Sequence, residues 1–247
     1  MSEIRLILLL AAGDWRRSRK DFTLLWLLLS PVVNGLVLMA VLPRLAWILD
    51  NDVDLLAYKP VIVGFVFLWL CPLSIGLWAS MLFLEEKEKG LKVMALLPIS
   101  RSGFLAYRLW LPGLYSFFLI LLGLVLCGPA GQSYGSLGWV SLVASLQTPL
   151  LGMMLFRFSK TRMQALQLSK LLRVIEFGVL FSFFWPPQWQ NLAGLVFPPY
   201  WVLKTYLIGS QEGPGYGLHL GFSMLFLLPF LVWARREFLS VYHQACR

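Results

Sequence analysis

Long apolar stretches without any Asp, Glu, Lys or Arg dominate the chain. They cover residues 22–43, 60–84, 109–156, 177–203 and 213–234. A helix needs about 20 apolar residues to cross the hydrocarbon core of a bilayer, so each stretch can form one crossing and residues 109–156 can form two. Turn-forming residues from Gly128 to Gly138 predict a tight hairpin between these two. The pattern predicts an all-α polytopic membrane protein with six transmembrane helices.

The basic residues are distributed unevenly between these stretches. With the N-terminus inside, 18 of the 21 Lys and Arg residues lie in cytoplasmic segments, whereas Arg44, Lys59 and Lys204 lie outside. Cytoplasmic loops carry such an excess of basic residues. We therefore expect both termini in the cytoplasm, and the chain, residues 1–247, to form a single multi-pass transmembrane domain in the plasma (inner) membrane of a bacterium.

The N-terminal segment, residues 1–21, has two interpretations. An apolar run over residues 4–12, followed by small residues, is weakly similar to a signal peptide. Basic residues follow at once, and positive charge at that place opposes translocation. We expect instead an uncleaved helix that lies at the cytoplasmic membrane surface. Its interfacial residues would be Trp15, Arg16, Arg17, Arg19 and Lys20.

The fifth stretch, residues 177–203, is irregular. Paired prolines follow Trp185 and Phe197, and prolines end a helix. The Trp and Tyr residues around them are typical of the membrane interface. Either the fifth helix ends near Trp185 and a broken re-entrant segment follows, or these residues lie at the outer interface. We favour a short helical hairpin over residues 185–204 that dips into the outer leaflet and returns before Lys204.

The composition excludes most other classes of protein. Of the 247 residues, 59% are hydrophobic and 13% are charged, and the mean hydropathy is +0.74. Soluble domains carry roughly 25% charged residues, which excludes a soluble enzyme and a disordered chain. The net charge of +9 reflects topology signals rather than binding of nucleic acid. Cys71, Cys127 and Cys246 form no Cys-x-x-Cys pair, which favours buried apolar residues over a metal site.

Few residues offer catalytic chemistry. The sequence contains no Gly-x-x-x-x-Gly-Lys-Ser/Thr loop and no His-Glu-x-x-His helix, so we expect neither ATP hydrolysis nor a metal centre in this chain. Ser182 and His219 could be nominated as the serine and histidine of an intramembrane enzyme, but ordinary packing is favoured. Glu176 follows Arg173 by three residues and is interpreted as half of an interfacial ion pair. A proton-coupled transporter would bury a carboxylate deeper, so we expect the energy source outside this chain.

The loop from residue 85 to residue 108 stands out among the polar segments. Leu91, Met94 and Leu97 recur at helical spacing while lysines take the opposite side, which predicts a short amphipathic helix at the membrane surface. Pro98 would end this helix. The alternative is a plain interfacial linker.

The same loop resembles the first cytoplasmic loop of the ABC-type-2 exporter permeases. Their common pattern is Glu-x-x-x-Gly-Thr-Leu-x-x-Leu-Leu-x-x-Pro-Ile/Val-Ser. This chain offers Glu86, Gly90, Leu91, Leu96, Leu97, Pro98 and Ser100 for that pattern and lacks its Thr. Residues 198–201, Pro-Pro-Tyr-Trp, are similar to a motif of small members. The expected topology is similar too, with a basic interfacial N-terminal helix, six spans and a broken segment between spans five and six.

The resemblance implies partners and residue roles. Two such subunits would pair as a homodimer or a heterodimer, and the pair would bind two copies of an ABC ATP-binding subunit. This chain would hold no cofactor, since ATP and Mg²⁺ would bind in the partner ATPase. Residues 1–21 would be the elbow helix, and the loop 85–108 would contain the coupling helix that docks on the ATPase. The docking residues would be Glu85, Glu86, Glu88, Lys89, Gly90, Leu91, Met94, Leu97, Pro98 and Ser100.

The resemblance also implies a function. The chain would be the permease subunit of an ATP-driven exporter that moves a hydrophobic or amphipathic substrate, such as a drug, a peptide or a lipid. The alternatives are export of a polysaccharide or glycolipid, secondary transport, and a non-ABC intramembrane enzyme or assembly factor. Polar residues within the spans, such as Ser116 and Gln147, either line a path or bond neighbouring helices, so no substrate residue is assigned.

Overall fold

The computed structural model describes residues 3–49, 58–88, 101–128, 132–183, 185–186, 189–190, 194, 199–210 and 215–245, and every regular element in these residues is helical. Apolar segments in lipid must satisfy their backbone hydrogen bonds internally, which favours helices. The elements are α1 Glu3–Lys20, α2 Phe22–Leu49, α3 Lys59–Phe65, η1 Val66–Leu70, α4 Cys71–Glu88, α6 Arg101–Cys127, α7 Tyr134–Ser145, α8 Gln147–Phe158, α9 Arg162–Ser182, α11 Pro199–Ser210 and α12 Tyr216–Ala245.

Five helical segments of the described residues are long and apolar enough to cross a membrane. They are Phe22–Leu45, Lys59–Lys87, Tyr107–Cys127, Tyr134–Phe158 and Tyr216–Trp233. These segments confirm four of the five charge-free stretches as helical, and the stretch at 109–156 forms two of them. The chain turns between Cys127 and Tyr134, within the predicted hairpin.

The helix that reaches into the fifth stretch begins earlier than predicted. The prediction of a span within residues 177–203 is corrected by α9, which already begins at Arg162 and ends at Ser182. The charge-free criterion missed the first part of α9 because that part contains Lys170, Arg173 and Glu176, and for the same reason α9 is not among the five apolar segments. The helix α11, Pro199–Ser210, contains Lys204. Most of residues 184–198 lie outside the described residues, so the re-entrant hairpin over residues 185–204 stays a prediction.

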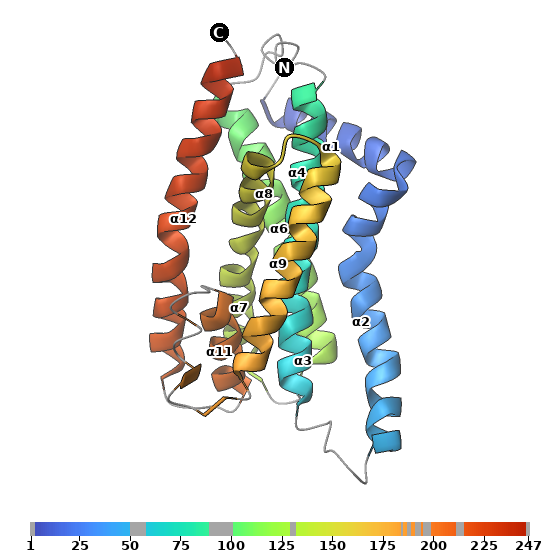
Figure 1. Cartoon of the computed structure of the whole chain (residues 1–247), viewed down its shortest axis with the longest axis vertical. Coiled ribbons are helices and arrows are strands. Elements are labelled where there is room, and N and C mark those ends of the chain that lie inside the picture. Colours follow the sequence, from blue (N-terminus) through green and yellow to red (C-terminus); the bar gives the residue numbers. More distant parts are fainter. Residues whose placement is uncertain are drawn as a thin grey trace.

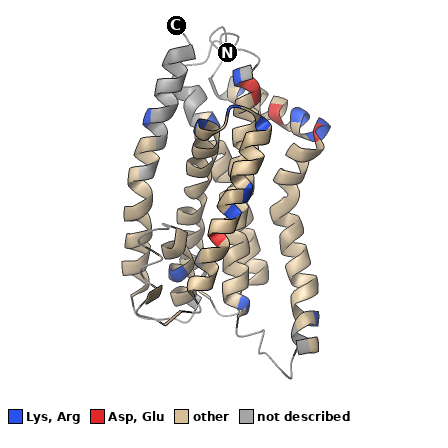
Figure 2. Cartoon of the chain, viewed as in Figure 1, with Lys and Arg blue, Asp and Glu red and all other residues tan. Residues whose placement is uncertain are grey.

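The long helices run side by side as a bundle, and α1 lies across one end of it (Figure 1). The end of α4 and the starts of α6 and α9 lie at this same end of the bundle, as do the start of α1 and the end of α12 (Figure 1). Figure 2 shows that most of the described charged residues gather there too. The opposite end carries few charges, which is the asymmetry that the basic residues of the sequence predict.

The elements α3, η1 and α4 follow one another in the segment Lys59–Lys87, which is the most buried of the five apolar segments. In an apolar 18-residue part of Lys59–Lys87, 78% of the residues are buried, compared with 33% in the corresponding part of Phe22–Leu45. Glycines allow α4 to approach α8 closely, because a Cβ on Gly76 would lie 3.0 Å from the backbone nitrogen of Gly152, and a Cβ on Gly152 would lie 3.2 Å from the carbonyl oxygen of Gly76. Small residues at helix crossings are the usual means of close packing in membranes.

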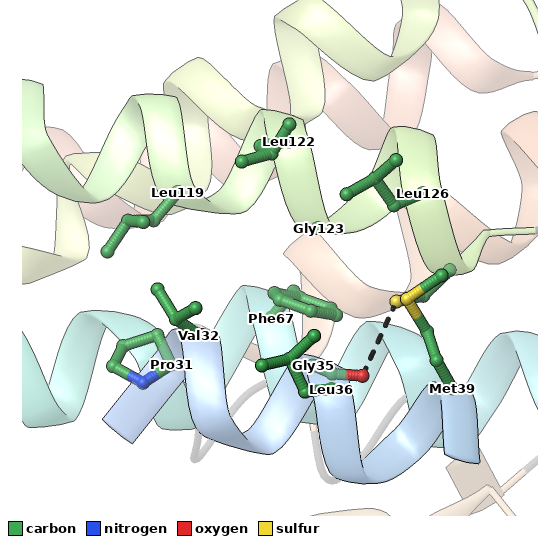
Figure 3. Close-up of a pocket in the computed structure, with 11 residues that line it drawn as sticks. Pro31, Val32, Gly35, Leu36, Met39, Phe67, Leu119, Leu122, Gly123 and Leu126 are labelled. Atoms are coloured by element: carbon green, nitrogen blue, oxygen red, sulfur yellow. Dashed lines mark hydrogen bonds between the residues drawn. The ribbon is translucent and has the colours of Figure 1, made fainter. Parts of the chain in front are cut away.

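A π-helical segment, η1, directs Phe67 into the gap between α2 and α6 (Figure 3). Pro72 follows η1 and has no N–H to donate, which favours a local widening of the helix. A Cβ on Gly123 would lie 2.0 Å from Phe67 Cε1, and a Cβ on Gly35 would lie 2.9 Å from Phe67 Cζ. The two glycines therefore make room for the ring, which forms one wall of an apolar crevice of about 80 Å³.

Candidate functional site

The structure places the two ends of the predicted coupling loop, which we call the feet of the loop. Glu85 and Glu86 lie in the last turn of α4, which ends at Glu88, and Tyr107 and Arg108 are the seventh and eighth residues of α6. The other predicted docking residues, Lys89, Gly90, Leu91, Met94, Leu97, Pro98 and Ser100, lie outside the described residues. The predicted amphipathic helix therefore stays a prediction, and the site is built from its feet.

The N-terminal helix α1 presents two different faces. Asp14 and Ser18 are one turn apart and buried, with 4% and 0% of their surface exposed. The predicted interfacial residues, Trp15, Arg16, Arg17, Arg19 and Lys20, are all exposed. Side chains four residues apart share one face of a helix, so Asp14 and Ser18 form a short polar face towards the bundle, and the basic residues around this face stay exposed.

Arg108 is the centre of a buried ion cluster beneath α1. Its guanidinium donates to Asp14 through Nη1, at 2.5 Å from Oδ2, and forms an ion pair with Glu86 through Nη2. Tyr107 donates its hydroxyl to the same Asp14 oxygen, and Arg17 lies 3.7 Å from Glu86 Oε1. We call these five residues the foot cluster. Hydrogen bonds between ionised groups are stronger than neutral ones, so the cluster ties both feet of the loop to α1.

Burial makes the foot cluster sensitive to the loss of Arg108, Asp14 or Glu86. The side chains of Arg108, Asp14 and Glu86 are 5%, 5% and 2% exposed. A buried charge that loses its partner costs far more than an exposed one, because no water replaces the lost interaction. Within the cluster, the negative charges of two carboxylates are balanced by the positive charges of two guanidiniums. In this chain the carboxylate of Glu86 therefore faces Arg108 rather than an open surface.

Ser18 extends the polar contact from α1 to the middle of α4. The indole Nε1 of Trp78 donates to Ser18 Oγ at 2.9 Å, and Ser18 Oγ donates to the backbone oxygen of Asp14 at 2.8 Å. Trp78 is 7% exposed, so its N–H needs a partner inside the protein. Hydrogen bonds at two successive turns, at Asp14 and at Ser18, therefore fix the position of α1 against the bundle.

A second ion cluster joins α2, α4 and α9 at the same end. Arg162, the first residue of α9, donates to Asp21 Oδ2 at 2.8 Å and pairs with Glu85. Asp21 also accepts the N–H of Thr23 at 2.9 Å, as an N-cap residue does at the start of a helix. These side chains are 17 to 32% exposed, so this cluster is less buried than the foot cluster.

The sequence analysis missed Asp14 and Arg108 as functional candidates. Arg108 is counted only as a cytoplasmic basic residue at the end of the loop 85–108, and Asp14 is not singled out, although it is an acidic residue inside a basic helix. The two are 94 positions apart, so no local spacing connects them. The signal that was available is the placement of both beside long apolar runs, where an ionised group needs a partner.

Other residues singled out in the sequence lie apart from these clusters. His219, on α12, stacks on Trp201 with ring centroids 5.8 Å apart, and Ser182 is the last residue of α9. Ser116 Oγ lies 2.6 Å from Thr148 Oγ1 and so bonds α6 to α8. Among the described residues, no group of three or more His, Cys, Asp or Glu side chains is placed to hold a metal ion.

Glu176 lies deeper than the sequence analysis expected. It is the fifteenth residue of α9 rather than the start of a span, and it is 4% exposed. Its Oε2 atom has no hydrogen-bond partner among the described residues. An interfacial position is therefore the wrong description of Glu176, because the helix begins earlier than the charge-free stretch suggested.

Comparison with known proteins gives one family and two relatives. A family model described as "Fluoroquinolones export permease protein Rv2686c-like" matches residues 14–234 of the chain. Two proteins of Mycobacterium tuberculosis, the fluoroquinolones export permease proteins MT2760 of strain CDC 1551 / Oshkosh and Rv2686c of strain H37Rv, are each 24% identical to the chain over 206 residues, which is 81% of this chain and 81% of each relative. No solved structure matches the chain.

Proposed function

Because the chain belongs to the Rv2686c-like family of fluoroquinolone export permeases, we propose that it is the transmembrane subunit of an exporter that is powered by ATP hydrolysis in a separate ABC subunit. The match of the family model over residues 14–234 carries this proposal. Five apolar helical segments in the described residues support a multi-pass membrane protein. The sequence has no phosphate-binding loop for ATP, so the proposal assigns nucleotide and Mg²⁺ to the partner.

The proposed substrate is an amphipathic drug with a flat aromatic core and polar end groups, such as a fluoroquinolone. The names of the two relatives state export of fluoroquinolones by those proteins, and this chain shares 81% of their length. Peptides and lipids belong to the same broad class of substrates. We propose outward movement across the inner membrane, by a pair of permease subunits and two ATPase copies.

The proposed orientation places the α1 end of the bundle in the cytoplasm. The excess of basic residues in the segments at that end supports this orientation. The loop 85–108 then faces the ATPase and contains the coupling helix, and α1 is the elbow helix. The foot cluster gives this arrangement a mechanism, since Glu86 and Arg108 hold the feet of the loop against Asp14 of α1. Packed elements move as units, so displacement of the loop would reach α1 and α4 together.

The decisive experiment uses this chain with an ATPase encoded beside it. The tagged permease is purified from native membranes, and uptake of ciprofloxacin is measured in inverted vesicles with ATP or with a non-hydrolysable analogue. We expect co-purification of the ATPase and uptake only with ATP. Absence of an ATPase partner, or uptake that does not depend on ATP, contradicts the proposal.

A double variant tests the docking loop within the same assay. Gly90→Asp with Leu97→Asp places two carboxylates on the predicted docking helix and leaves the apolar spans intact. We expect normal membrane insertion and loss of ATP-driven uptake while ATP hydrolysis by the partner continues. Unchanged uptake in the double variant shows that the loop does not dock as proposed.

A proton-coupled secondary transporter is the second candidate, and Glu176 favours it. A buried carboxylate within a membrane helix is a common marker of proton coupling, and Glu176 is 4% exposed. Under this alternative, Glu176→Gln abolishes drug uptake driven by a proton gradient without ATP. Under the leading proposal, uptake needs ATP and survives the substitution.

A further inference from the structure

A cavity of drug-sized volume lies between α6 and the junction of α7 and α8. Its volume is about 480 Å³. Ile7 of α1 lines it from the end of the bundle where α1 lies, and Leu142, Ser145 and Pro149 line it from α7 and α8. Binding sites for drug-sized molecules have volumes of about 300–1,000 Å³, so one such molecule fits in this space.

Two backbone features create the cavity. Pro149 lies in the first turn of α8 and has no N–H to donate to the carbonyl of Ser145, so the long segment Tyr134–Phe158 divides at Leu146. On the facing wall, Gly113 has no side chain. A Cβ at Gly113 would lie 3.7 Å from both Pro149 Cδ and the carbonyl oxygen of Ser145. The cavity therefore lies where a glycine of α6 faces a helix break.

The walls of the cavity suit a flat aromatic molecule. Tyr107, Trp110 and Phe117 all belong to α6 and line the same cavity. Aromatic faces stack on flat rings with favourable geometry. Trp110 and Leu114 are each 55% exposed, so one side of the cavity opens towards the surroundings of the bundle, where a membrane lipid phase would lie. A molecule dissolved in the bilayer can then enter from the side.

One end of the cavity reaches the foot cluster. Tyr107 and Leu111 line the large cavity and also a small one, which Asp14, Trp78 and Arg108 share. The Tyr107 hydroxyl donates to Asp14, while its ring forms part of the cavity wall. A ligand that moves this ring would disturb the same bond that holds α1 to the feet of the loop.

We propose that this cavity is the uptake site for a drug-sized molecule with a flat, largely apolar aromatic body, which enters laterally from the leaflet on the α1 side. Bound in the cavity, the molecule stacks on the aromatic residues of α6 and contacts Tyr107, so occupancy reaches the foot cluster and the docking loop. The inference rests on the proposed function for the choice of substrate class. The site itself rests on the volume, the aromatic lining and the continuity with the foot cluster.

The test measures binding to the purified permease without its partner. The chain is placed in lipid nanodiscs and titrated with ciprofloxacin, and Gly113→Leu is compared with the matched control Gly221→Leu. A Cβ at Gly221, on α12, would have no atom within 4 Å, so the control adds the same side chain in open space. We expect binding at least tenfold weaker in Gly113→Leu and unchanged binding in Gly221→Leu. Ser145→Leu, which fills the cavity from α7, repeats the effect and guards against a misfolded first variant.

Each outcome of the titration decides the proposal. Equal affinity in the wild type, Gly113→Leu and Ser145→Leu, all with native melting temperatures, overturns it, and so does a wild type that does not bind ciprofloxacin. If native mass spectrometry finds a phospholipid that only the filled variants lose and that ciprofloxacin does not displace, the cavity is a lipid site and the proposal is also overturned. ATP-dependent uptake with the partner is measured separately, so a failed uptake site with intact export leaves the proposed function standing.

Discussion

The two ends of the bundle are held by different interactions. At the α1 end, buried ions of the foot cluster join α1, α4 and α6, whereas at the other end aromatic rings join α3, α11 and α12 (Figure 1). There Trp201 stacks on Phe222 with centroids 5.3 Å apart and on Phe226 at 6.2 Å, and Tyr200 stacks on Phe183 at 5.0 Å.

This difference has a physical consequence for how each end responds to change. Buried ions require defined partners at defined distances, because an unpaired charge has no substitute in a water-free interior. Ring contacts are weaker individually and less directional, so neighbouring rings can adjust. Under the proposed function, the α1 end transmits a displacement and benefits from contacts of the first kind.

Removal of Arg108 should have the largest effect on stability. Arg108→Met leaves Asp14 buried without its cation and leaves Glu86 only the half-exposed Arg17. The loss of one partner from a buried ion pair costs about 3–5 kcal/mol. We expect a strongly reduced yield of folded protein and a lower melting temperature in detergent. Arg16→Met removes an exposed arginine of α1 and is the matched control.

A triple variant tests whether the loss of stability in Arg108→Met is caused by the unpaired charges. Adding Asp14→Asn and Glu86→Gln to Arg108→Met removes all three charges together and should recover part of the lost stability. No recovery in the triple variant assigns the effect of Arg108 to packing instead of to its ion pairs.

Loss of the Tyr107 hydroxyl should have an intermediate effect. Tyr107→Phe keeps the ring and removes one of the two donors to Asp14 Oδ2, while Arg108 stays as the other. A hydrogen bond to a charged group contributes about 1.5–3 kcal/mol. We expect a moderate decrease in the free energy of unfolding and weaker stimulation of the partner ATPase by the drug. Tyr134→Phe, at an exposed tyrosine, should change neither. A stable variant with normal stimulation separates Tyr107 from the coupling path.

Substitution in the aromatic end should cost less. Trp201→Phe keeps an aromatic ring but loses the hydrogen bond from Trp201 Nε1 to the Gly194 carbonyl, which measures 2.9 Å. One hydrogen bond contributes about 1 kcal/mol, so we expect a small decrease in melting temperature and unchanged ATP-driven uptake. A collapse as large as that of Arg108→Met shows that the aromatic end is no more tolerant than the charged one.

The smallest effect is expected for the cation above these rings. Lys204 Nζ lies 5.5 Å from the Tyr200 ring centroid and 5.8 Å from that of Trp201. A cation–π contact contributes about 0.5–1 kcal/mol at a partly exposed site. Lys204→Gln should therefore shift the melting temperature slightly, and Lys204→Arg should restore it. Loss of folding in Lys204→Gln, with recovery in Lys204→Arg, makes this end charge-dependent as well.

The sequence predicted a helix correctly where a long apolar stretch contains no charged residue. The stretches at 22–43, 60–84 and 213–234 needed only length and hydropathy, since lipid imposes the same helical solution on each. It failed at α9, where Lys170, Arg173 and Glu176 interrupt the apolar pattern of a helix that still packs along the bundle. The charge-free criterion treats such a residue as the end of a span, although neighbouring helices can bury it.

The sequence could not predict the foot cluster or the cavity between α6 and the α7–α8 junction, and the reason is the same for both. Asp14 meets Arg108 across 94 positions, and Gly113 faces Pro149 across 36 positions, so neither pair leaves a local pattern. The sequence by itself determined a chain of apolar helices with a basic end, because composition and charge decide how a segment partitions into a bilayer. Only the tertiary structure decided which ions meet and where a helix break leaves space, because both depend on how distant helices lie against one another.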